Sequence, residues 1–317
     1  MSENFNEEYK KIINSISQEL IEFDKDICIC LSNNNVQKTQ ITPIIKEFLL
    51  NKGKRIRPAL TFLFAKAISN EIKEINYKIA TTNELIHNAT LIHDDIIDCS
   101  IMRRGKKTLN FNYDSKLAVL AGDYLLAKAI AILNTIKDDE IRNLHTDTVS
   151  ALINGELFQY FNRFKLLSIE EYIEKSKNKT ARLFEACIVS TYLASKKTDF
   201  LENARNFALN FGIAFQIHND LKNISNLEKI SEDIKNGDYS APIIFYAQDN
   251  NLKTIKNENK LLKDIKNSSA IQKTKALITE YTNKAIENLS FIEDNLYKEA
   301  LVNLCKLYTK NWKNLDG

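Results

Sequence analysis

The sequence predicts an all-α protein that forms one domain from a bundle of long helices. Its 317 residues include only three prolines and seven glycines, so residues that interrupt helices are scarce. Apolar residues recur every three or four positions, and the sustained apolar–polar alternation of strands is missing from the sequence. No stretch rich in Pro, Gly and Ser divides the chain. We therefore expect residues 1–317 to form a single domain.

The expected helices follow the apolar periodicity along the chain. We expect helices over residues 12–27, 85–98, 117–135, 141–164, 168–194, 200–223, 240–248, 270–288 and 293–312, the last two as an antiparallel closing pair. The most apolar window, 117–136, contains Asp123 and Lys128, so it predicts a buried helix and not a membrane span.

Charge and the N-terminal residues limit the class of protein. The chain carries 44 basic and 41 acidic residues, interspersed, for a net charge of +3. A nucleic-acid partner would favour a strongly basic surface, so we expect none. The first residues lack the basic-then-apolar order of a signal peptide. We expect a cytoplasmic protein without a transmembrane segment.

A basic turn at residues 51–58, NKGKRIRP, predicts an anion-binding site. Gly53 fits the end of one helix, and Pro58 fits the first turn of the next. Between them lie Lys54, Arg55 and Arg57, close to backbone N–H groups at a helix start that also attract anions. The three cations are phosphate-ligand candidates, and a solvated basic turn is the alternative.

The stretch ELIHNATLIHDDIIDCSIMRRG, residues 84–105, concentrates charge on an apolar helix. Asp94 and Asp98 share one helical face, and Asp95 lies about 100° round the helix. Carboxylates four residues apart repel each other unless a cation lies between them, and Mg²⁺ takes one or two carboxylates together with phosphate oxygens. Arg103 and Arg104 could each bind phosphate through two guanidinium nitrogens. The pattern favours a metal and phosphate site, and a solvated acidic surface is the alternative.

Two middle helices carry further polar candidates. Ser168 and Glu171 form a capping-box pattern that opens a helix running through Lys179, one more phosphate-ligand candidate. The preceding helix offers polar residues that could line a cavity, or could be ordinary helix polarity: Asn154, Gly155, Glu156 and Gln159.

The helix over 200–223 ends in a second polar face. Gln216, Asp220 and Asn223 follow one another at spacings of four and three, and Asn219 lies four residues before Asn223. Carboxylate and amide oxygens can coordinate Mg²⁺. Asp220 is therefore a metal candidate, with the two asparagines as weaker ones. Helix capping by these asparagines is the alternative.

Together these stretches resemble the trans-prenyltransferase family, the isoprenyl and polyprenyl diphosphate synthases. The motifs occur in the family's order, with similar separations, across about residues 40–245: GKRIRP at 53–58, ExxH at 84–87, ATLIHDDIID at 89–98, RRG at 103–105, GD at 122–123, KT at 179–180 and FQI at 215–217. Each motif alone is weak, but the combination is specific. The resemblance implies helices around a deep central cavity, usually in a homodimer, with a heteromer as an alternative.

The resemblance also implies an activity and a set of site residues. It implies Mg²⁺-dependent condensation of isopentenyl diphosphate with an allylic diphosphate. By position, the metal ligands would be Asp94 and Asp98, with Asp95 supporting. The allylic diphosphate would contact Arg103, Lys179 and Gln216, with Thr180 lining the same site. Isopentenyl diphosphate would contact Lys54, Arg57, His87 and Arg104, with Arg55 nearby.

Product length can be predicted from the residues that precede the aspartates. Ala89 and Thr90 lie about one helical turn before Asp94. In the family, aromatic residues there block the cavity at farnesyl length, whereas small residues leave it open. We therefore expect a product longer than farnesyl diphosphate, with Ile86, one turn further, as a later stop.

The chain also departs from the family. The family's second D-D-x-x-D motif is replaced by Asn219-Asp220-x-x-Asn223, and a later Gly-Lys by Gly237-Asp238. Two alternatives to an elongating enzyme follow: a weakly active or inactive regulatory subunit of a heteromeric synthase, or a prenyl diphosphate lyase or cyclase. The intact basic residues for isopentenyl diphosphate argue against the cyclase.

Overall fold

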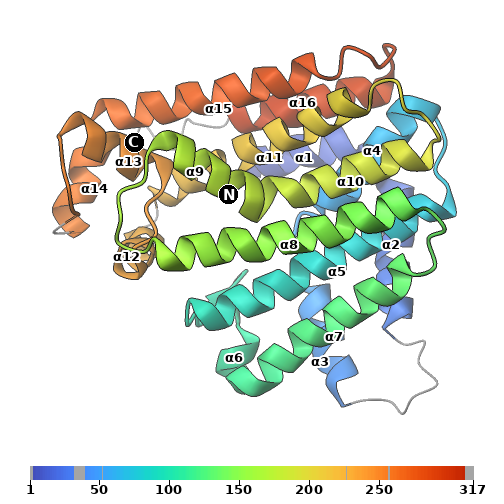
Figure 1. Cartoon of the computed structure of the whole chain (residues 1–317), viewed down its shortest axis with the longest axis horizontal. Helices are drawn as coiled ribbons and strands as arrows, with labels where there is room; N and C mark the ends of the chain where they lie inside the picture. Colours follow the sequence, from blue (N-terminus) through green and yellow to red (C-terminus); the bar gives the residue numbers. More distant parts are fainter. Residues whose placement is uncertain (1–2, 32–39, 52, 226, 256–257, 311–317) are drawn as a thin grey trace. The chain divides into compact units, whose positions relative to one another are not determined.

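The computed structural model describes residues 3–31, 40–51, 53–225, 227–255 and 258–310, and almost all regular structure in these ranges is helical (Figure 1). The all-α prediction is confirmed. The chain divides into two compact units: unit 1 comprises residues 1–12, 146–185 and 198–317, and unit 2 comprises residues 13–145 and 186–197. This division does not test the predicted single domain, which stays a prediction.

Unit 2 is organised around one long buried helix. That helix, α5, spans Glu74–Ile97 and packs against the next long helix of the unit and against the helix before it (Figure 1). The other elements of unit 2 are η1 (Asn14–Ile16), α2 (Ser17–Cys30), α3 (Ile41–Leu50), α4 (Ile56–Ser69), β1 (Met102–Arg103), β2 (Lys106–Lys107), α6 (Leu109–Asn112) and α7 (Ser115–Leu133). Helix α4 is buried on nearly every side, which fits its almost wholly apolar sequence.

A minimal hairpin of two short strands interrupts the helices of unit 2 without changing the all-α class. Met102 pairs with Lys107 and Arg103 with Lys106, so Arg104 and Gly105 form a two-residue loop. Both loop residues have positive φ, 51° and 76°. That geometry is typical of the tight turns that match strand twist. The hairpin follows directly after the aspartate-bearing end of α5 and fixes where the two arginines lie.

Helix α7 differs from its prediction in burial. It was expected to be a buried helix, yet Val119, Leu120 and Ile130 are exposed by 42%, 59% and 58%. Its opposite side, which includes Ala121 and Leu125, is buried. The helix therefore buries one side against α5 and leaves an apolar stripe exposed. None of the helices in the described ranges is long and apolar enough to cross a membrane.

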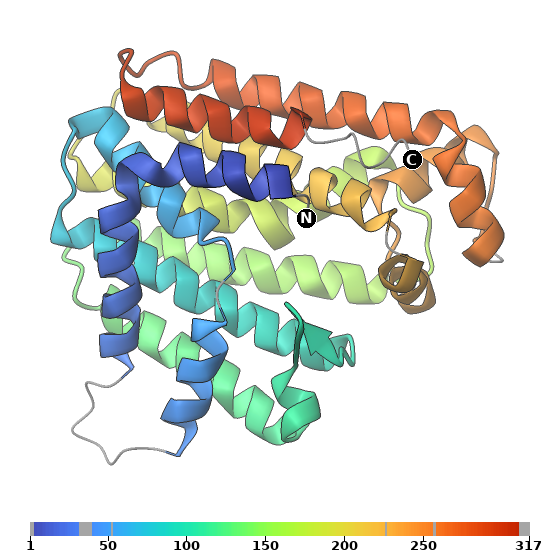
Figure 2. The same cartoon turned by 180° about the vertical axis from the view of Figure 1, so that it is seen from behind.

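Unit 1 is built on α11, Leu201–Asn223, which packs against α15, Ser269–Glu287. Figure 2 shows α15 beside α16, Leu296–Lys310, which confirms the predicted closing pair within the described residues. The other elements of unit 1 are α9 (Ile169–Ser176), η2 (Lys177–Ala181), α12 (Leu227–Asn236), α13 (Ala241–Asp249) and α14 (Glu258–Lys266). Helices α1 (Glu3–Ile13), α8 (Asp139–Phe161) and α10 (Arg182–Ala194) each contain a unit boundary.

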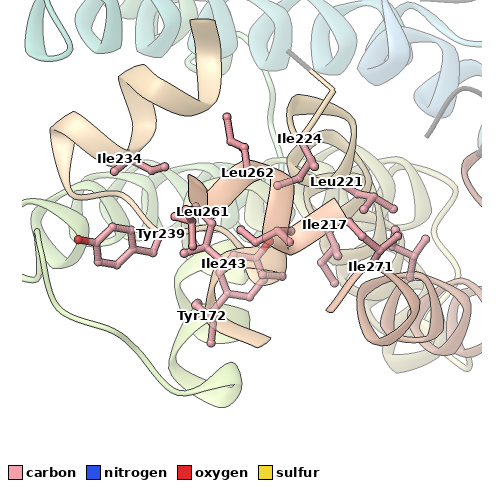
Figure 3. Packing of buried hydrophobic residues seen from close by; sticks show 14 of the residues in the cluster. Tyr172, Ile217, Leu221, Ile224, Ile234, Tyr239, Ile243, Leu261, Leu262 and Ile271 are labelled. Atoms are coloured by element: carbon pink, nitrogen blue, oxygen red, sulfur yellow. The ribbon is translucent and has the colours of Figure 1, made fainter. Parts of the chain in front are cut away.

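The core of unit 1 joins α9, α11, α13 and α15. Figure 3 shows the buried side chains that form it, among them Ile217 and Leu221 of α11, Ile243 of α13 and Ile271 of α15. Tyr172 of α9 belongs to the same cluster and is 1% exposed. Burial of such side chains stabilises the unit by about 1.5–3 kcal/mol each. The ring of Tyr172 is thereby fixed in place.

The helix predicted over 168–194 is interrupted by a π-helical segment. Ser168 caps α9 as predicted: its Oγ accepts from the Glu171 N–H at 3.1 Å, and its own N–H donates to Glu171 Oε2 at 2.8 Å. After α9, residues Lys177–Ala181 form the π turn η2, and α10 continues from there. Such π turns are frequent at functional sites. This one carries Lys179 and Thr180.

Candidate active site

The end of α5 directs its three aspartates into different environments. Asp95 is 2% exposed and bound by Arg103, whose Nε lies 2.8 Å from both Oδ1 and Oδ2 and whose Nη2 lies 2.8 Å from Oδ1. Burial raises the pKa of Asp95, and the Arg103 guanidinium opposes that rise. Asp95 therefore holds Arg103 beside the helix end. The predicted role of Asp95 in supporting the metal ligands stays a prediction.

Asp94 and Asp98 keep the helical spacing that the sequence predicts. The Asp98 N–H donates to the Asp94 carbonyl at 2.8 Å, so the helical path continues to the end of α5. Both carboxylates are partly exposed, whereas Asp95 is buried. Two carboxylates on one face suit Mg²⁺, which completes its shell with water or phosphate oxygens. The donor set of Asp94 and Asp98 therefore fits a divalent cation. Their metal role stays a prediction.

His87 lies within a cluster of arginines in unit 2. Burial lowers the pKa of His87 well below its usual value, and the charges of Arg57, Arg104, Arg103 and Arg55 lower it further. The imidazole is therefore neutral at neutral pH and offers a hydrogen bond instead of a charge. Four guanidinium groups act on this position, so an anion there would be strongly attracted.

The cluster is shaped around Gly53. A Cβ on Gly53 would lie 2.7 Å from Nη2 of Arg104, closer than two such atoms approach. The Arg104 Nη1 donates to the Asn51 carbonyl at 3.1 Å. The glycine therefore lets the Arg104 guanidinium lie against the turn that carries Lys54 and Arg57. The predicted isopentenyl diphosphate ligands are thus close together, while their contact with substrate stays a prediction.

Arg55 has structural partners on three sides. Its Nη1 lies 2.5 Å from Glu84 Oε1, its Nε lies 3.3 Å from Asp24 Oδ1, and its Nη2 donates to the Leu49 carbonyl at 2.9 Å. Its guanidinium also lies 5.7 Å from the ring of Phe23. The backbone of Arg55 is left-handed, at φ 53°. Arg55 anchors the basic turn, and its predicted place near the substrate is not tested.

The predicted chain-length residues lie on the buried side of α5. Ala89 and Ile86 are 0% and 1% exposed. Thr90 is partly exposed, and its hydroxyl donates to the His87 carbonyl at 2.8 Å. Their effect on product length stays a prediction.

Unit 1 contains a polar pocket, which we call the lysine pocket. It is lined by residues from α8, α9, η2, α11 and α12 and from the segment before α13: Gln159, Tyr172, Lys175, Ser176, Lys179, Thr180, Gln216, Asp220, Asp233, Asp238 and Ser240. Three of the predicted allylic ligands, Lys179, Thr180 and Gln216, are therefore brought together. The sequence prediction that Gln159 lines a polar cavity is consistent with this pocket.

Lys179 is held by α8. Its Nζ lies 2.6 Å from Glu156 Oε2 and donates to Gln159 Oε1 at 3.0 Å. A Cβ on Gly155 would lie 2.9 Å from the Lys179 backbone nitrogen. Gly155 therefore allows the π turn to approach α8 closely enough for both contacts.

Asp220 is the centre of a hydrogen-bond chain in the lysine pocket. The Tyr172 hydroxyl donates to Asp220 Oδ2 at 2.6 Å, and Gln216 Nε2 donates to Oδ1 at 2.8 Å. The Thr180 hydroxyl donates to Gln216 Oε1 at 2.8 Å, which orients the amide. Burial raises the pKa of Asp220 to about 6, against the lowering effect of the Tyr172 hydrogen bond.

The Asp220 site fits a metal poorly. Both carboxylate oxygens accept hydrogen bonds from the protein, and its neighbours Asn219 and Asn223 offer only neutral amide oxygens. Among the residues that the structure describes, no group of three or more His, Cys, Asp or Glu side chains is arranged to hold a metal ion, at Asp220 or at the end of α5. We therefore assign no metal ion to Asp220.

Sequence reasoning gave no site role to three residues that form polar pairs in this pocket. Tyr172, Lys175 and Asp238 carry no motif of their own, and their partners are distant in the sequence. Lys175 Nζ lies 2.6 Å from Asp238 Oδ1, and Tyr172 binds a carboxylate 48 positions away. The only sequence signal was Asp238, which stands where the family resemblance leads one to expect a lysine.

The fold and these two sites define a helical protein that concentrates carboxylates and cations suited to diphosphate groups. Comparisons with known proteins give the family. The family model for polyprenyl synthetase matches residues 38–281, and the chain belongs to this family.

Similar proteins agree with that assignment. A prenyl transferase of Cyanidium caldarium is 35% identical over 248 residues, which cover 74% of this chain and 75% of that protein. The decaprenyl-diphosphate synthase of Dictyostelium discoideum is 30% identical over 331 residues, covering 97% and 72%. The crystal structure of heptaprenyl diphosphate synthase from Staphylococcus aureus aligns with a TM-score of 0.86 at 26% identity and covers 93% of this chain and 98% of that one.

Proposed function

We propose that the protein is a Mg²⁺-dependent prenyltransferase that condenses isopentenyl diphosphate with an allylic diphosphate and releases diphosphate. The observation that carries this proposal is in unit 2: Asp95, the neighbour of Asp94 at the end of α5, binds Arg103, and Arg103 is one of four arginines whose charges act on His87. Substrates with diphosphate groups require such a combination. Membership of the polyprenyl synthetase family and the names of its relatives support the same activity.

In this proposal, the residues of the two sites bind the metal ion and the two diphosphate substrates. Asp94 and Asp98 would hold Mg²⁺, which when bound supplies positive charge to the leaving diphosphate. Arg103 would contact the allylic diphosphate from the position that Asp95 fixes. Lys179 and Gln216 would contact it from the lysine pocket. Lys54, Arg57, His87 and Arg104 would bind isopentenyl diphosphate, with His87 as a neutral donor.

The reaction needs no protein nucleophile. The allylic carbon–oxygen bond breaks, and the diphosphate leaves with the electron pair. The double bond of isopentenyl diphosphate then attacks the allylic cation, and a proton is lost from the new chain. The chain's cations stabilise charge that develops on the leaving oxygen, a contribution typical of preorganised donors. We assign the proton to the departing diphosphate and name no protein base.

The expected product is longer than farnesyl diphosphate. Ala89 and Thr90 add little bulk one turn before Asp94, and relatives named for decaprenyl and heptaprenyl diphosphate support a long product. Substituting Ala89 with Phe should shorten the product, because in the family an aromatic residue at this position blocks the growing chain. Ala276→Phe, on the exposed side of α15, is the matched control and should leave product length unchanged.

Assembly and location are also part of the proposal. A homodimer would cover the apolar stripe of Val119, Leu120 and Ile130 on α7. Gel filtration with light scattering tests this. The cytoplasmic location predicted from the sequence remains a proposal, and fractionation of cells tests it.

One assay decides the main proposal. The purified protein is incubated with Mg²⁺, labelled isopentenyl diphosphate and allylic primers of increasing length, and the products are separated by chain length. We expect label in products longer than farnesyl. Failure to incorporate label with any primer would leave the regulatory subunit as the better proposal, and cyclic hydrocarbon from the primer alone would establish a cyclase.

A further inference from the structure

The lysine pocket contains more carboxylates than the single one, Asp220, in the motif Asn219-Asp220-x-x-Asn223. Asp220, Asp233 and Asp238 all line it, together with the ammonium groups of Lys175 and Lys179. Such a group of carboxylates repels itself unless cations are interposed. The position of Lys175 shows how that repulsion is relieved.

Lys175 is a buried lysine held at a defined point of the pocket. Its side chain is 9% exposed, and its Nζ lies 2.6 Å from Asp238 Oδ1. The same Nζ lies 5.5 Å from the ring centre of Tyr172, whose hydroxyl donates to Asp220 at 2.6 Å. Because Tyr172 is fixed in the core of unit 1, the ammonium is confined between the Asp238 carboxylate and the residue that binds Asp220.

Both carboxylates respond to this one ammonium group. Burial raises the pKa of Asp220, and the charge of Lys175 is among the effects that oppose it. Burial would also raise the pKa of Asp238, but the charges of Lys175 and then Lys179 overcome it and lower that pKa. A divalent cation shared by two carboxylates would act on them in the same way.

We propose that the Lys175 ammonium is a built-in cation that takes the place of a divalent metal ion between Asp238 and Asp220. The inference rests on the proposed function, since it concerns how one substrate diphosphate is balanced. The lysine pocket would then meet that diphosphate with two ammonium groups, Lys175 and Lys179, and bind no metal of its own.

The departures from the family pattern fit this exchange. Asp238 stands where the resemblance leads one to expect a lysine, while Lys175 brings a lysine into the same pocket from α9. The positive charge that the family resemblance leads one to expect after Gly237 is therefore supplied here from helix α9. Asn219 and Asn223, which replace carboxylates, are also expected in a site that holds no metal.

Binding of Mn²⁺, used as a probe for Mg²⁺, tests the inference directly. The Asp94→Asn/Asp98→Asn chain serves as background, so that the carboxylates of α5 do not contribute. Titration calorimetry and electron paramagnetic resonance are run with and without inorganic diphosphate. We expect the background chain to bind no Mn²⁺ in the lysine pocket. Adding Lys175→Met should create one Mn²⁺ site in the pocket, at least tenfold tighter than any residual binding of Mn²⁺ by the background chain, because Asp220 and Asp238 lose their cation.

Further variants separate a cation from a packing residue. Asp238→Asn on top of Lys175→Met should abolish the new site. Lys175→Arg should bind no Mn²⁺, since the charge is kept. Lys177→Met, two residues away and paired with Glu174 at 3.4 Å, is the matched control and should behave like the background.

Two results would overturn the inference. One is a folded Lys175→Met chain that gains no Mn²⁺ site. The other needs no change at Lys175: Mn²⁺ bound by the background chain and lost on Asp238→Asn would show that a metal already occupies the pocket. Incorporation of isopentenyl diphosphate by the unaltered protein is measured separately. That result decides the proposed function whichever way the Mn²⁺ titration falls.

Discussion

The aspartate end of α5 in unit 2 and the Asp220 region of α11 in unit 1 differ in how the protein surrounds a carboxylate that is removed from solvent. In unit 2, Asp95 is neutralised by Arg103, and two more carboxylates follow on the partly exposed face. In unit 1, Asp220 is bound by the neutral groups of Tyr172 and Gln216, and its neighbours are amides.

The two units differ in the groups that oppose the effect of burial on these carboxylates. Burial raises the pKa of both carboxyl groups. At Asp95 the rise is opposed by the hydrogen bonds and charge of Arg103, whereas at Asp220 it is opposed by the Tyr172 hydrogen bond and the Lys175 charge, and that pKa still reaches about 6. Unit 2 therefore retains a carboxylate pair suited to a metal ion, and unit 1 relies on lysines. Five experiments test this contrast.

The largest effect is expected from Asp94→Ala. Removing one carboxylate of the proposed metal pair removes charge stabilisation in the transition state, so kcat should fall by roughly 10³-fold or more. Steady-state kinetics at saturating Mg²⁺ measure it. Asp139→Ala, an exposed carboxylate paired with Arg142 on α8, is the control and should leave kcat unchanged. Activity within threefold of the unaltered enzyme would refute the metal role of Asp94.

Asp95→Asn should have the next largest effect. The amide keeps the shape but removes the charged partner of Arg103, so we expect a loss of about 3 kcal/mol in unfolding free energy. The KM for the allylic diphosphate should rise by about tenfold, because Arg103 is no longer fixed. Denaturant unfolding and steady-state kinetics measure the two effects.

Glu84→Gln provides the matched control for Asp95→Asn. It breaks a second buried ion pair of unit 2, between Glu84 and Arg55, and should lower stability by a similar amount. The KM for the allylic diphosphate should not change. If both variants raised that KM equally, general destabilisation would explain the effect and Arg103 would lose its assigned role.

Local signals in the sequence were sufficient for part of this contrast. The common face of Asp94 and Asp98, the capping box at Ser168 and the helix order all follow from spacings of three and four residues. The pair of Lys175 and Asp238 spans 63 positions, so no periodicity reveals it. Asp220 looked like a metal ligand because its hydrogen-bond donor Tyr172 lies 48 positions away. The sequence does not reveal the long-range partners of a carboxylate, and those partners decide whether its oxygens are available to bind a metal ion.

The partly buried Asp220 should give unit 1 a distinct pH dependence. Its pKa is raised from 3.8 to about 6, so the folded state holds a proton that the unfolded state releases. Its stabilising contribution is complete below pH 3.8 and is lost as the pH rises through 6. Relative to Asp220→Asn, the unaltered protein should lose about 2–3 kcal/mol between pH 4 and 7.

Thermal unfolding of both proteins across this pH range measures the difference. The comparison is needed because His145 in unit 2 has the opposite effect. Burial lowers the pKa of His145 to about 4, so its contribution is lost as the pH falls from 6.5 towards 4. Both proteins share that effect, and it cancels. Parallel curves for the two proteins would show that Asp220 does not titrate as described.

Restoring carboxylates in unit 1 should make it only slightly better at binding a metal ion, so the difference from unit 2 should shrink little. With Asn219→Asp/Asn223→Asp, the Mg²⁺ concentration for half-maximal rate should fall by about threefold, a modest gain because Asp220 stays hydrogen-bonded. Rates measured across a Mg²⁺ titration test this. Asn206→Asp, earlier on α11, is the control for added charge. An unaltered titration would assign the two asparagines to helix capping alone.

The smallest effect is expected from Gly53→Ala, which tests how unit 2 places Arg104. The added Cβ would lie 2.7 Å from Arg104 Nη2, the far end of a flexible side chain, so the guanidinium can move away at little cost. The KM for isopentenyl diphosphate should rise by about threefold, and that for the allylic diphosphate should stay constant.

In unit 1, Gly155→Ala is the matched change, because its Cβ would lie 2.9 Å from the Lys179 backbone nitrogen. That variant should alter the KM for the allylic diphosphate instead. A Gly53→Ala enzyme with an unchanged KM for isopentenyl diphosphate would show that Arg104 does not contact this substrate.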